Sequence, residues 1–134
     1  MDALATLRSK IPGFPGYGDA DARRLCDEEV RAYLGEALAA LGTRLGSVGA
    51  LNERYESTLL RAEFINQSAF RVFELADLDD AHIAAMAAAD LAVLELADRA
   101  GAVDASSLGA YLDSINAAID ERERLMKTSS STLT

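Results

Sequence analysis

Apolar residues recur along this chain in the three- and four-residue steps of amphipathic helices. The first long series predicts a helix with Asp19 as its N-cap and the apolar positions Val30, Leu34, Leu38, Leu41, Leu45 and Val48. Its end stays open, because Gly42, Gly46 and Gly49 each cost a helix interior about 1 kcal/mol relative to alanine. The helix either stops near Leu41 or continues weakly to Val48.

Three further series predict three more helices. The second runs from Ala50 to about Ala76, and its apolar positions are Leu51, Tyr55, Leu59, Ala62, Ile65, Ala69 and Phe73. The acidic residues of 77–80 break the chain and offer N-caps for a third helix that closes at Gly101, and Asp104 caps a fourth that runs to Leu125. We expect these side chains to be buried: Leu34, Leu38, Leu59, Ile65, Phe73, Leu94, Leu112 and Ile115.

A segment that contains both prolines precedes these helices and cannot be helical. In residues 11–18 proline and glycine alternate, which forces tight bends after a short helix from about Ala3 to Lys10. Its aromatic residues, Phe14 and Tyr17, are expected to pack against the bundle, near Tyr55 or the aromatic residues of the second helix. The turn is then either a structural clasp or a recognition loop whose aromatic rings anchor a partner.

Together these elements predict an all-α protein. The arrangement expected is an antiparallel up-and-down four-helix bundle with a short amino-terminal helix and a Pro/Gly turn, because no alternating strand pattern occurs and the connections are short. We expect a single domain over residues 1–127 and a disordered tail over 128–134. No apolar run is long enough to span a membrane, and the acidic start of the chain lacks the basic region of a secretory signal, which favours a cytoplasmic protein.

Charge is distributed unevenly over the chain. The net charge is -9, and residues 72–121 contain eleven acids and a single base, Arg99, which gives that stretch a charge of -10. Such a surface repels phosphate and argues against nucleic-acid binding. The acidic face either meets a basic partner or is a solvated surface that keeps an alanine-rich bundle in solution.

The chain contains few residues that could perform catalysis. His82 is the single histidine, expected in the first turn of the third helix near Asp79 with an exposed imidazole, so neither a Ser-His-Asp triad nor a Glu-x-x-His di-iron site can be assembled. No glycine-rich phosphate loop is present. Cys26, the one cysteine, is expected to be a small core or half-buried residue. We therefore predict no catalytic residue, no metal ligand and no cofactor.

Asp90 lies at helical spacing among apolar residues of the third helix. Its carboxylate either points into the bundle or reaches water at the boundary, and a buried carboxylate needs a partner. The candidates by pattern are Arg61 and Arg71, together with Tyr55 and Asn66, all in the second helix. An Arg–Asp pair would fix the register of the two helices.

Residues 11–17, with the sequence Ile-Pro-Gly-Phe-Pro-Gly-Tyr, are followed by Arg23, Arg24, Asp27 and Arg31. This opening resembles a family of short bacterial all-helical proteins in which a Pro-Gly-aromatic-x-Gly-Tyr turn leads into a charged helix. A later helix of the family carries an aromatic patch like residues 64–73, followed by an acidic residue placed as Asp90 is. Some members are encoded beside band-7 (SPFH) membrane-scaffold proteins, so the resemblance implies a scaffold or adaptor role and no activity.

The function expected from the sequence is that of a non-enzymatic helical interaction protein, an adaptor or scaffold, whose protein partner the sequence does not identify. We expect it to form a homodimer. The alternative is a carboxylate-based metal-binding bundle, since 22 acids are present on a helical scaffold.

Overall fold

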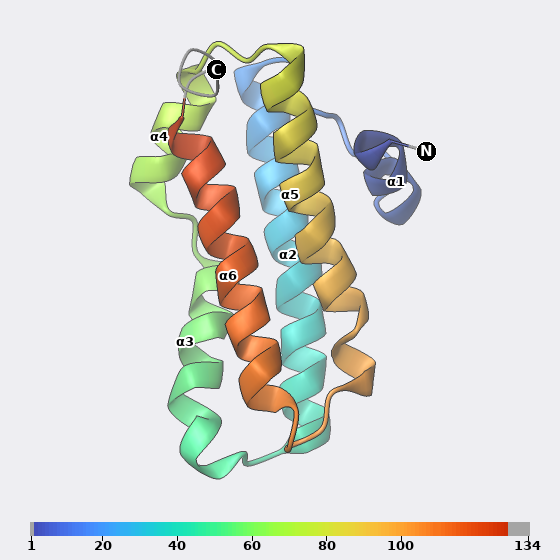
Figure 1. Cartoon of the computed structure of the whole chain (residues 1–134), viewed down its shortest axis with the longest axis vertical. Coiled ribbons are helices and arrows are strands. Elements are labelled where there is room, and N and C mark those ends of the chain that lie inside the picture. Colours follow the sequence, from blue (N-terminus) through green and yellow to red (C-terminus); the bar gives the residue numbers. More distant parts are fainter. Residues whose placement is uncertain (1, 129–134) are drawn as a thin grey trace.

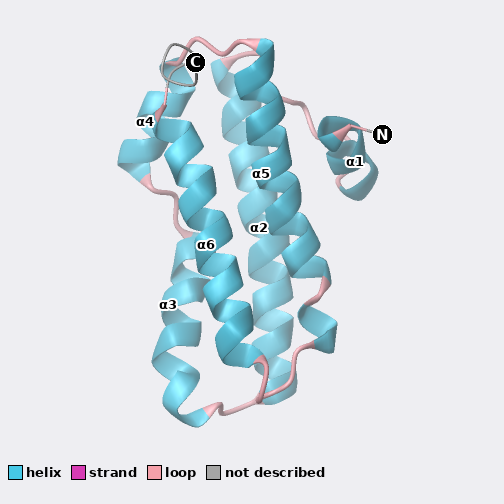
Figure 2. Ribbon diagram, viewed as in Figure 1, coloured by secondary structure: helices cyan, strands magenta, loops and turns pink. Residues whose placement is uncertain are grey.

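The computed structural model describes residues 2–128, and in that part of the chain all regular secondary structure is helical, with no strand (Figures 1 and 2). This confirms the all-α fold expected from the sequence. The α-helices are α1 (Ala3–Lys10), α2 (Ala20–Leu45), α3 (Asn52–Glu63), α4 (Gln67–Leu75), α5 (Asp80–Asp98) and α6 (Leu108–Lys127). Short 3-10 turns follow α2 and α5, at Gly49–Leu51 and Ala100–Ala102.

Four rods form the bundle: α2, α3 with α4, α5 and α6, each antiparallel to the next along the chain (Figure 1). Around the bundle, however, α2 packs against α3, α4 and α5, and α6 packs against the same three helices. The α3–α4 rod and α5 therefore lie across a diagonal, and the short connection between them crosses one end of the bundle (Figure 1). The short α1 lies outside the four rods and packs on α5.

The glycines of α2 left the end of this helix open in the sequence, and the structure shows where it ends. The helix continues through Gly42 and ends at Leu45, where Gly46 adopts a φ of 68° and donates its N–H to the carbonyl of Gly42. A left-handed φ of this kind favours glycine. Gly42 itself is required by packing, because a Cβ there would stand 2.2 Å from the hydroxyl of Tyr55, which donates to the carbonyl of Leu38.

The second helix expected from the sequence is wrong in one respect, because it is broken into α3 and α4. Phe64 is extended, with φ -114° and ψ 130°, and Asn66 caps α4 by accepting a hydrogen bond from the N–H of Ala69 at 3.1 Å. Helical spacing of apolar residues continues across the break, which is why the periodicity did not reveal it. Asn66 did indicate a new helix start in the sequence, since asparagine is a strong N-cap residue.

Most of the expected core is buried, with one displacement on α3. Six of the eight predicted residues are buried: Leu34, Leu38, Phe73, Leu94, Leu112 and Ile115. Leu59 and Ile65 are instead half-buried at the edge of the core, while Thr58 and Ala62 are the buried residues of α3. The helix is thus rotated by about one position from the predicted face, because the break at Phe64 frees α3 from the register of α4.

The amino-terminal segment folds as predicted. Helix α1 covers Ala3–Lys10, with Asp2 as its N-cap. The Pro/Gly turn follows, with left-handed φ values of 86° at Gly13 and 90° at Gly16. Arg8 holds the turn from the helix side by donating to the carbonyl oxygens of Phe14 and Pro15.

Within residues 2–128, none of the helices combines the length and the apolar character needed to cross a membrane. Thr128 caps α6 by bonding to the carbonyl of Leu125. The tail expected to be disordered was 128–134, of which Thr128 is thus ordered and residues 129–134 lie outside the described residues.

Gly42→Ala tests the close approach of α2 and α3. The added methyl group would overlap the Tyr55 hydroxyl, so we expect the free energy of unfolding to fall by about 1–3 kcal/mol. The matched control is Gly35→Ala in the same helix, where nothing lies within 4 Å of the new Cβ and alanine should stabilise by about 0.5–1 kcal/mol. Urea unfolding measures both, and a stabilising Gly42→Ala would contradict the packing described.

Candidate functional site

A continuous chain of hydrogen bonds runs from the bundle interior to its surface. The Tyr17 hydroxyl donates to Oδ2 of Asp90 at 2.5 Å, and Nε of Arg122 donates to Oδ1 of the same carboxylate at 2.5 Å. Nη1 of Arg122 reaches Oδ1 of Asp27 at 2.8 Å, and Arg31 donates from Nε to the other oxygen of Asp27 at 2.8 Å. Arg31 ends the chain by donating from Nη1 to the carbonyl of Glu63. We call these residues the ionic network.

The network joins elements that are far apart in the sequence. Tyr17 comes from the Pro/Gly turn, Asp27 and Arg31 from α2, Asp90 from α5 and Arg122 from α6. Arg122 is 7% exposed, Asp27 1% and Asp90 0%, so all three charges are withdrawn from water. Buried charges are tolerated only when they are paired and hydrogen-bonded, as they are here. The network therefore ties α2, α5 and α6 to one another and to the turn.

Burial and ion pairing have opposite effects on the pKa of the Arg122 guanidinium. Burial alone would lower the pKa of its guanidinium, but the carboxylates of Asp90 and Asp27 reverse this effect and raise the pKa, so Arg122 stays charged. The pKa of the Tyr17 hydroxyl is raised, first by burial and then by the negative charge of Asp90. Tyr17 is therefore a neutral hydrogen-bond donor to Asp90.

Asp90 points into the bundle, but the partners predicted for it are wrong. Arg61 lies at the surface of α3 and pairs with Asp120 and Glu123 of α6, and Arg71 is exposed on α4. The reason is the diagonal arrangement, because α3 and α4 lie across the bundle from α5 and cannot reach its inner face. Arg122, the actual partner, follows two acids in a charged stretch of α6, where no pattern distinguishes a buried arginine from an exposed one.

Phe14 and Tyr17 are buried, with 2% and 3% of their surfaces exposed. Their rings meet edge to face at 6.0 Å, and Tyr17 meets Phe73 of α4 at 6.1 Å. This confirms the expected packing near the aromatic residues of the second helix, although not near Tyr55, which packs on Gly42. The burial supports the structural clasp. A recognition role for these rings would require the turn to open.

Arg23 is a buried residue whose role the sequence did not reveal. Its Nε donates to the carbonyl of Tyr17, and its Nη1 donates to the carbonyls of Phe73 and Ala76 at the end of α4. Helix ends leave carbonyl groups without partners, and an arginine can supply the missing donors. Arg23 thus replaces a glycine cap and attaches α4 to the turn.

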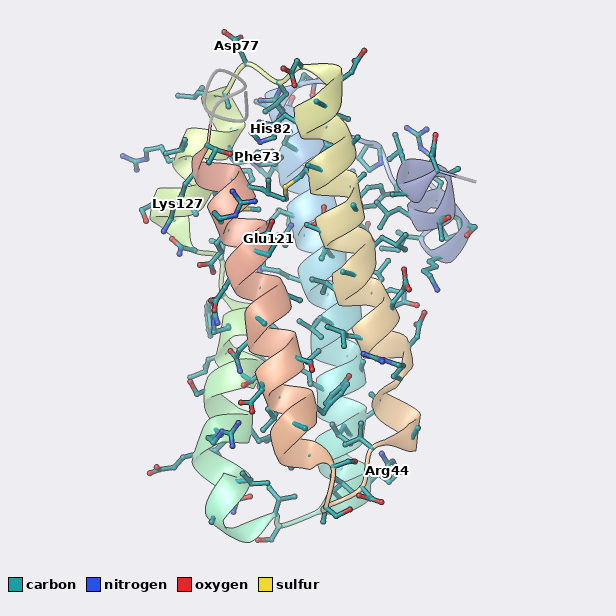
Figure 3. The ribbon with its side chains drawn as sticks, viewed as in Figure 1. Arg44, Phe73, Asp77, His82, Glu121 and Lys127 are labelled. Atoms are coloured by element: carbon teal, nitrogen blue, oxygen red, sulfur yellow. The ribbon has the colours of Figure 1, made fainter. Side chains whose placement is uncertain are left out.

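His82 is fully buried, contrary to the exposed imidazole predicted from its place in a first helical turn. Asp79 caps the helix through the N–H of His82, and this places the ring in the interior, at the end of the bundle where Phe73 also lies (Figure 3). Nε2 lies 2.9 Å from the carbonyl of Leu125, and Nδ1 has no hydrogen-bond partner within residues 2–128. A carbonyl can only accept, so Nε2 carries the proton.

A pocket opens at the break between α3 and α4, beside the ionic network. It encloses about 30 Å³, which is room for about one water molecule. Its polar lining consists of Asp27, Arg31, Arg61, Asn66, Arg122 and Glu123, and its apolar lining of Val30, Leu34, Ala62, Phe64, Ile65, Val93, Ile119 and Met126. The network therefore has one edge that faces a cavity.

Most of the exposed large apolar side chains lie on the rod formed by α3 and α4. Among the described residues, five large hydrophobic residues are exposed: Leu25, Leu60, Phe64, Val72 and Leu75. All except Leu25 belong to α3, α4 or the break between them. We call Leu60, Phe64, Val72 and Leu75 the apolar surface.

The metal-binding alternative finds no support in residues 2–128, where no three His, Cys, Asp or Glu side chains are grouped so that they could hold a metal ion. Cys26 is buried, as expected, and its thiol donates to the carbonyl of Gly16.

Fold and site together define a small helical bundle built around a buried ionic network. Comparison of the chain with protein-family models, with curated proteins and with solved structures gave no match. Its function has to be inferred from its own residues.

Arg122→Met tests the network. The change leaves the buried carboxylates of Asp27 and Asp90 without their shared partner, so we expect the free energy of unfolding to fall by about 3–5 kcal/mol. The matched control is Arg124→Met on the same helix, whose solvent-exposed ion pair with Glu121 should contribute little to stability. Equal effects in urea unfolding would show that Arg122 is not buried as described.

The Cys26 thiol should be unreactive in the folded protein. Burial raises its pKa to about 12, so almost no thiolate is present at pH 8, and the side chain is not exposed. We expect an aromatic disulfide reagent to modify one thiol per chain rapidly in urea and many times more slowly without it. Rapid modification of the native protein at pH 8 would contradict this environment.

Proposed function

We propose that this chain is a non-enzymatic interaction protein, an adaptor or scaffold, which binds an amphipathic helix of a partner protein on its apolar surface. The observation that carries the proposal is the concentration of exposed apolar side chains on one rod of the bundle. Leu60 is 54% exposed, Phe64 67% and Leu75 80%. Apolar groups that gather on one part of a surface are typical of protein-binding sites, whereas scattered ones are not.

The charges on α3 indicate the chemistry of the partner. The arginines of this helix, Arg54 and Arg61, are paired with acids of α6. Its glutamates, Glu53, Glu56 and Glu63, are exposed and form no ion pair with a described residue. A partner helix with an apolar face flanked by lysine or arginine would match this arrangement, because unpaired acids around an apolar centre select basic neighbours.

The scaffold behind this surface supports a binding role. The break at Phe64 is held by Arg31, which bonds to the carbonyl of Glu63, and by Asn66, which bonds to Glu123 of α6. A surface that is held rigid before binding loses less entropy when the partner docks. The resemblance to helical proteins encoded beside membrane scaffolds points to the same kind of role.

A homodimer and a cytoplasmic location are further proposals from the sequence. Light scattering after gel filtration tests the first, and a monomer across the micromolar range would overturn it.

The direct test of the proposed function uses a synthetic 14-residue helix of leucine and lysine, with a leucine and glutamate helix of the same pattern as control. We expect saturable shifts of α3 and α4 amide signals with the lysine peptide and none with the glutamate peptide. Leu60→Ser with Phe64→Ser should weaken binding about tenfold or more, because two exposed anchors are lost. Leu25→Ser, on α2, is the matched control and should bind unchanged.

The same variants identify the native partner. A cellular protein retained by the unmodified chain and by Leu25→Ser, but lost with the double variant, would support the proposal. Binding of the lysine peptide that survives the double variant would contradict it, as would equal binding of the glutamate peptide.

A further inference from the structure

We propose that the pocket at the break between α3 and α4 binds a small carboxylate with an apolar body, whose carboxylate oxygens accept hydrogen bonds from Arg31 and Arg122. This site is distinct from the apolar surface, although Phe64 borders both. The pocket contains both hydrogen-bonding groups that are used and groups that are not.

Every carboxylate oxygen in the pocket wall already accepts a hydrogen bond. Oδ1 of Asp27 accepts from Arg122 and Oδ2 accepts from Arg31. Oε1 of Glu123 accepts from Arg61, and Oε2 accepts from Asn66. A ligand that brings donors, such as an ammonium group, therefore has to share these oxygens with arginine and asparagine donors that are already bound.

Several N–H donors of the arginines in the pocket wall, by contrast, remain unused. Arg122 donates from Nε and Nη1, and Arg31 donates from Nε and Nη1, so Nη2 of each has no acceptor among the described residues. Nε of Arg61 is unused in the same way. Because Asp27 bonds to both Arg31 and Arg122, the two guanidinium groups are held on either side of one carboxylate. A guanidinium binds carboxylate oxygens in its own plane and suits this task better than an ammonium group.

The arginines of the lining are balanced by acids. Three arginines line the pocket against two acids, Asp27 and Glu123, and Asp90 and Asp120 pair with Arg122 and Arg61 from outside the lining. Charge alone therefore does not select an anion. The preference for a ligand that accepts hydrogen bonds comes from the unused arginine donors, which are partly shielded from water, where a charged hydrogen bond is stronger than at the surface.

The rest of the lining is apolar, which defines the body of the ligand. Val30, Val93 and Met126 are buried side chains of three different helices. The enclosed space holds little more than a water molecule, so a larger ligand must displace the side chains at the mouth. Phe64 is 67% exposed and is the side chain that has to swing outward, whereas Arg61 is held by Asn116, Asp120 and Glu123. Next to the pocket lies a groove lined by Leu60 and Phe64 of the apolar surface together with Ser57, Arg61, Asn66 and Glu123.

The experiment uses the absence of tryptophan from the sequence. Phe64→Trp introduces a single indole at the pocket mouth, in a position exposed enough to accept it. Its emission is followed while hexanoate, hexanol, hexylammonium and acetate are added at constant ionic strength. We expect saturable binding of hexanoate, about tenfold or more tighter than hexanol or hexylammonium, because only the carboxylate accepts from the unused donors. Acetate should bind more weakly, by roughly fourfold for each methylene that no longer packs in the pocket.

Arg31→Gln in the Phe64→Trp background should weaken hexanoate binding about tenfold and leave hexanol binding unchanged. The control is Arg24→Gln, which changes an exposed arginine of the same helix. The probe series on the Phe64→Trp protein remains decisive if Arg31→Gln does not fold. The proposal is overturned if hexanoate gives no saturable change, if hexanol binds as tightly as hexanoate, or if a folded Arg31→Gln protein binds hexanoate unchanged.

Discussion

Arg122 holds two carboxylates, Asp27 and Asp90, inside the bundle, and the positions of three helices follow from that arrangement. Each of these three charged side chains would be costly to bury without a partner. Removing one of them would therefore leave an uncompensated buried charge and destabilise the fold. An apolar core would tolerate small shifts of one helix along another, because dispersion contacts are numerous and weakly directional. Two short charged hydrogen bonds to one guanidinium tolerate much less, and they fix how α6 sits between α2 and α5.

The same network reaches the ends of the molecule. Through Tyr17 it attaches the Pro/Gly turn to α5, and Arg23 then connects that turn to the end of α4. Through Arg31 it reaches the last carbonyl of α3, where the break begins. The break creates both the pocket and the exposed position of Phe64, so the two proposed binding regions lie where the ionic network meets the surface. A protein of this kind uses buried charge to set the shape of a binding face rather than to perform a reaction.

Local features of the sequence predicted much of the fold. Apolar periodicity gave α2, α5 and α6, proline and glycine gave the turn, and the expectation that Asp90 points inward was correct. The rest depended on tertiary arrangement. Arg61 and Arg71 were reasonable partners for Asp90 if sequential helices were neighbours, but α3 and α4 lie diagonally opposite α5. His82 was expected at the surface because residues in the first turn of a helix are often exposed. Its burial depends on α6, where the carbonyl of Leu125 lies within hydrogen-bond distance of the ring. A pocket left no trace in the sequence because its lining comes from four separate stretches of the chain.

The most direct measurement for this account is the exchange of the arginine Nε–H protons with solvent in the unmodified protein, followed by NMR after transfer to heavy water. The Nε–H of Arg122 donates to a fully buried carboxylate, whereas the Nε–H of Arg124 donates to a half-exposed one. We predict that the Arg122 signal persists as long as the most protected backbone amides, because both exchange only when the bundle opens. An Arg122 signal lost as quickly as that of Arg124 would show that the ionic network is open to water, and the account would be wrong.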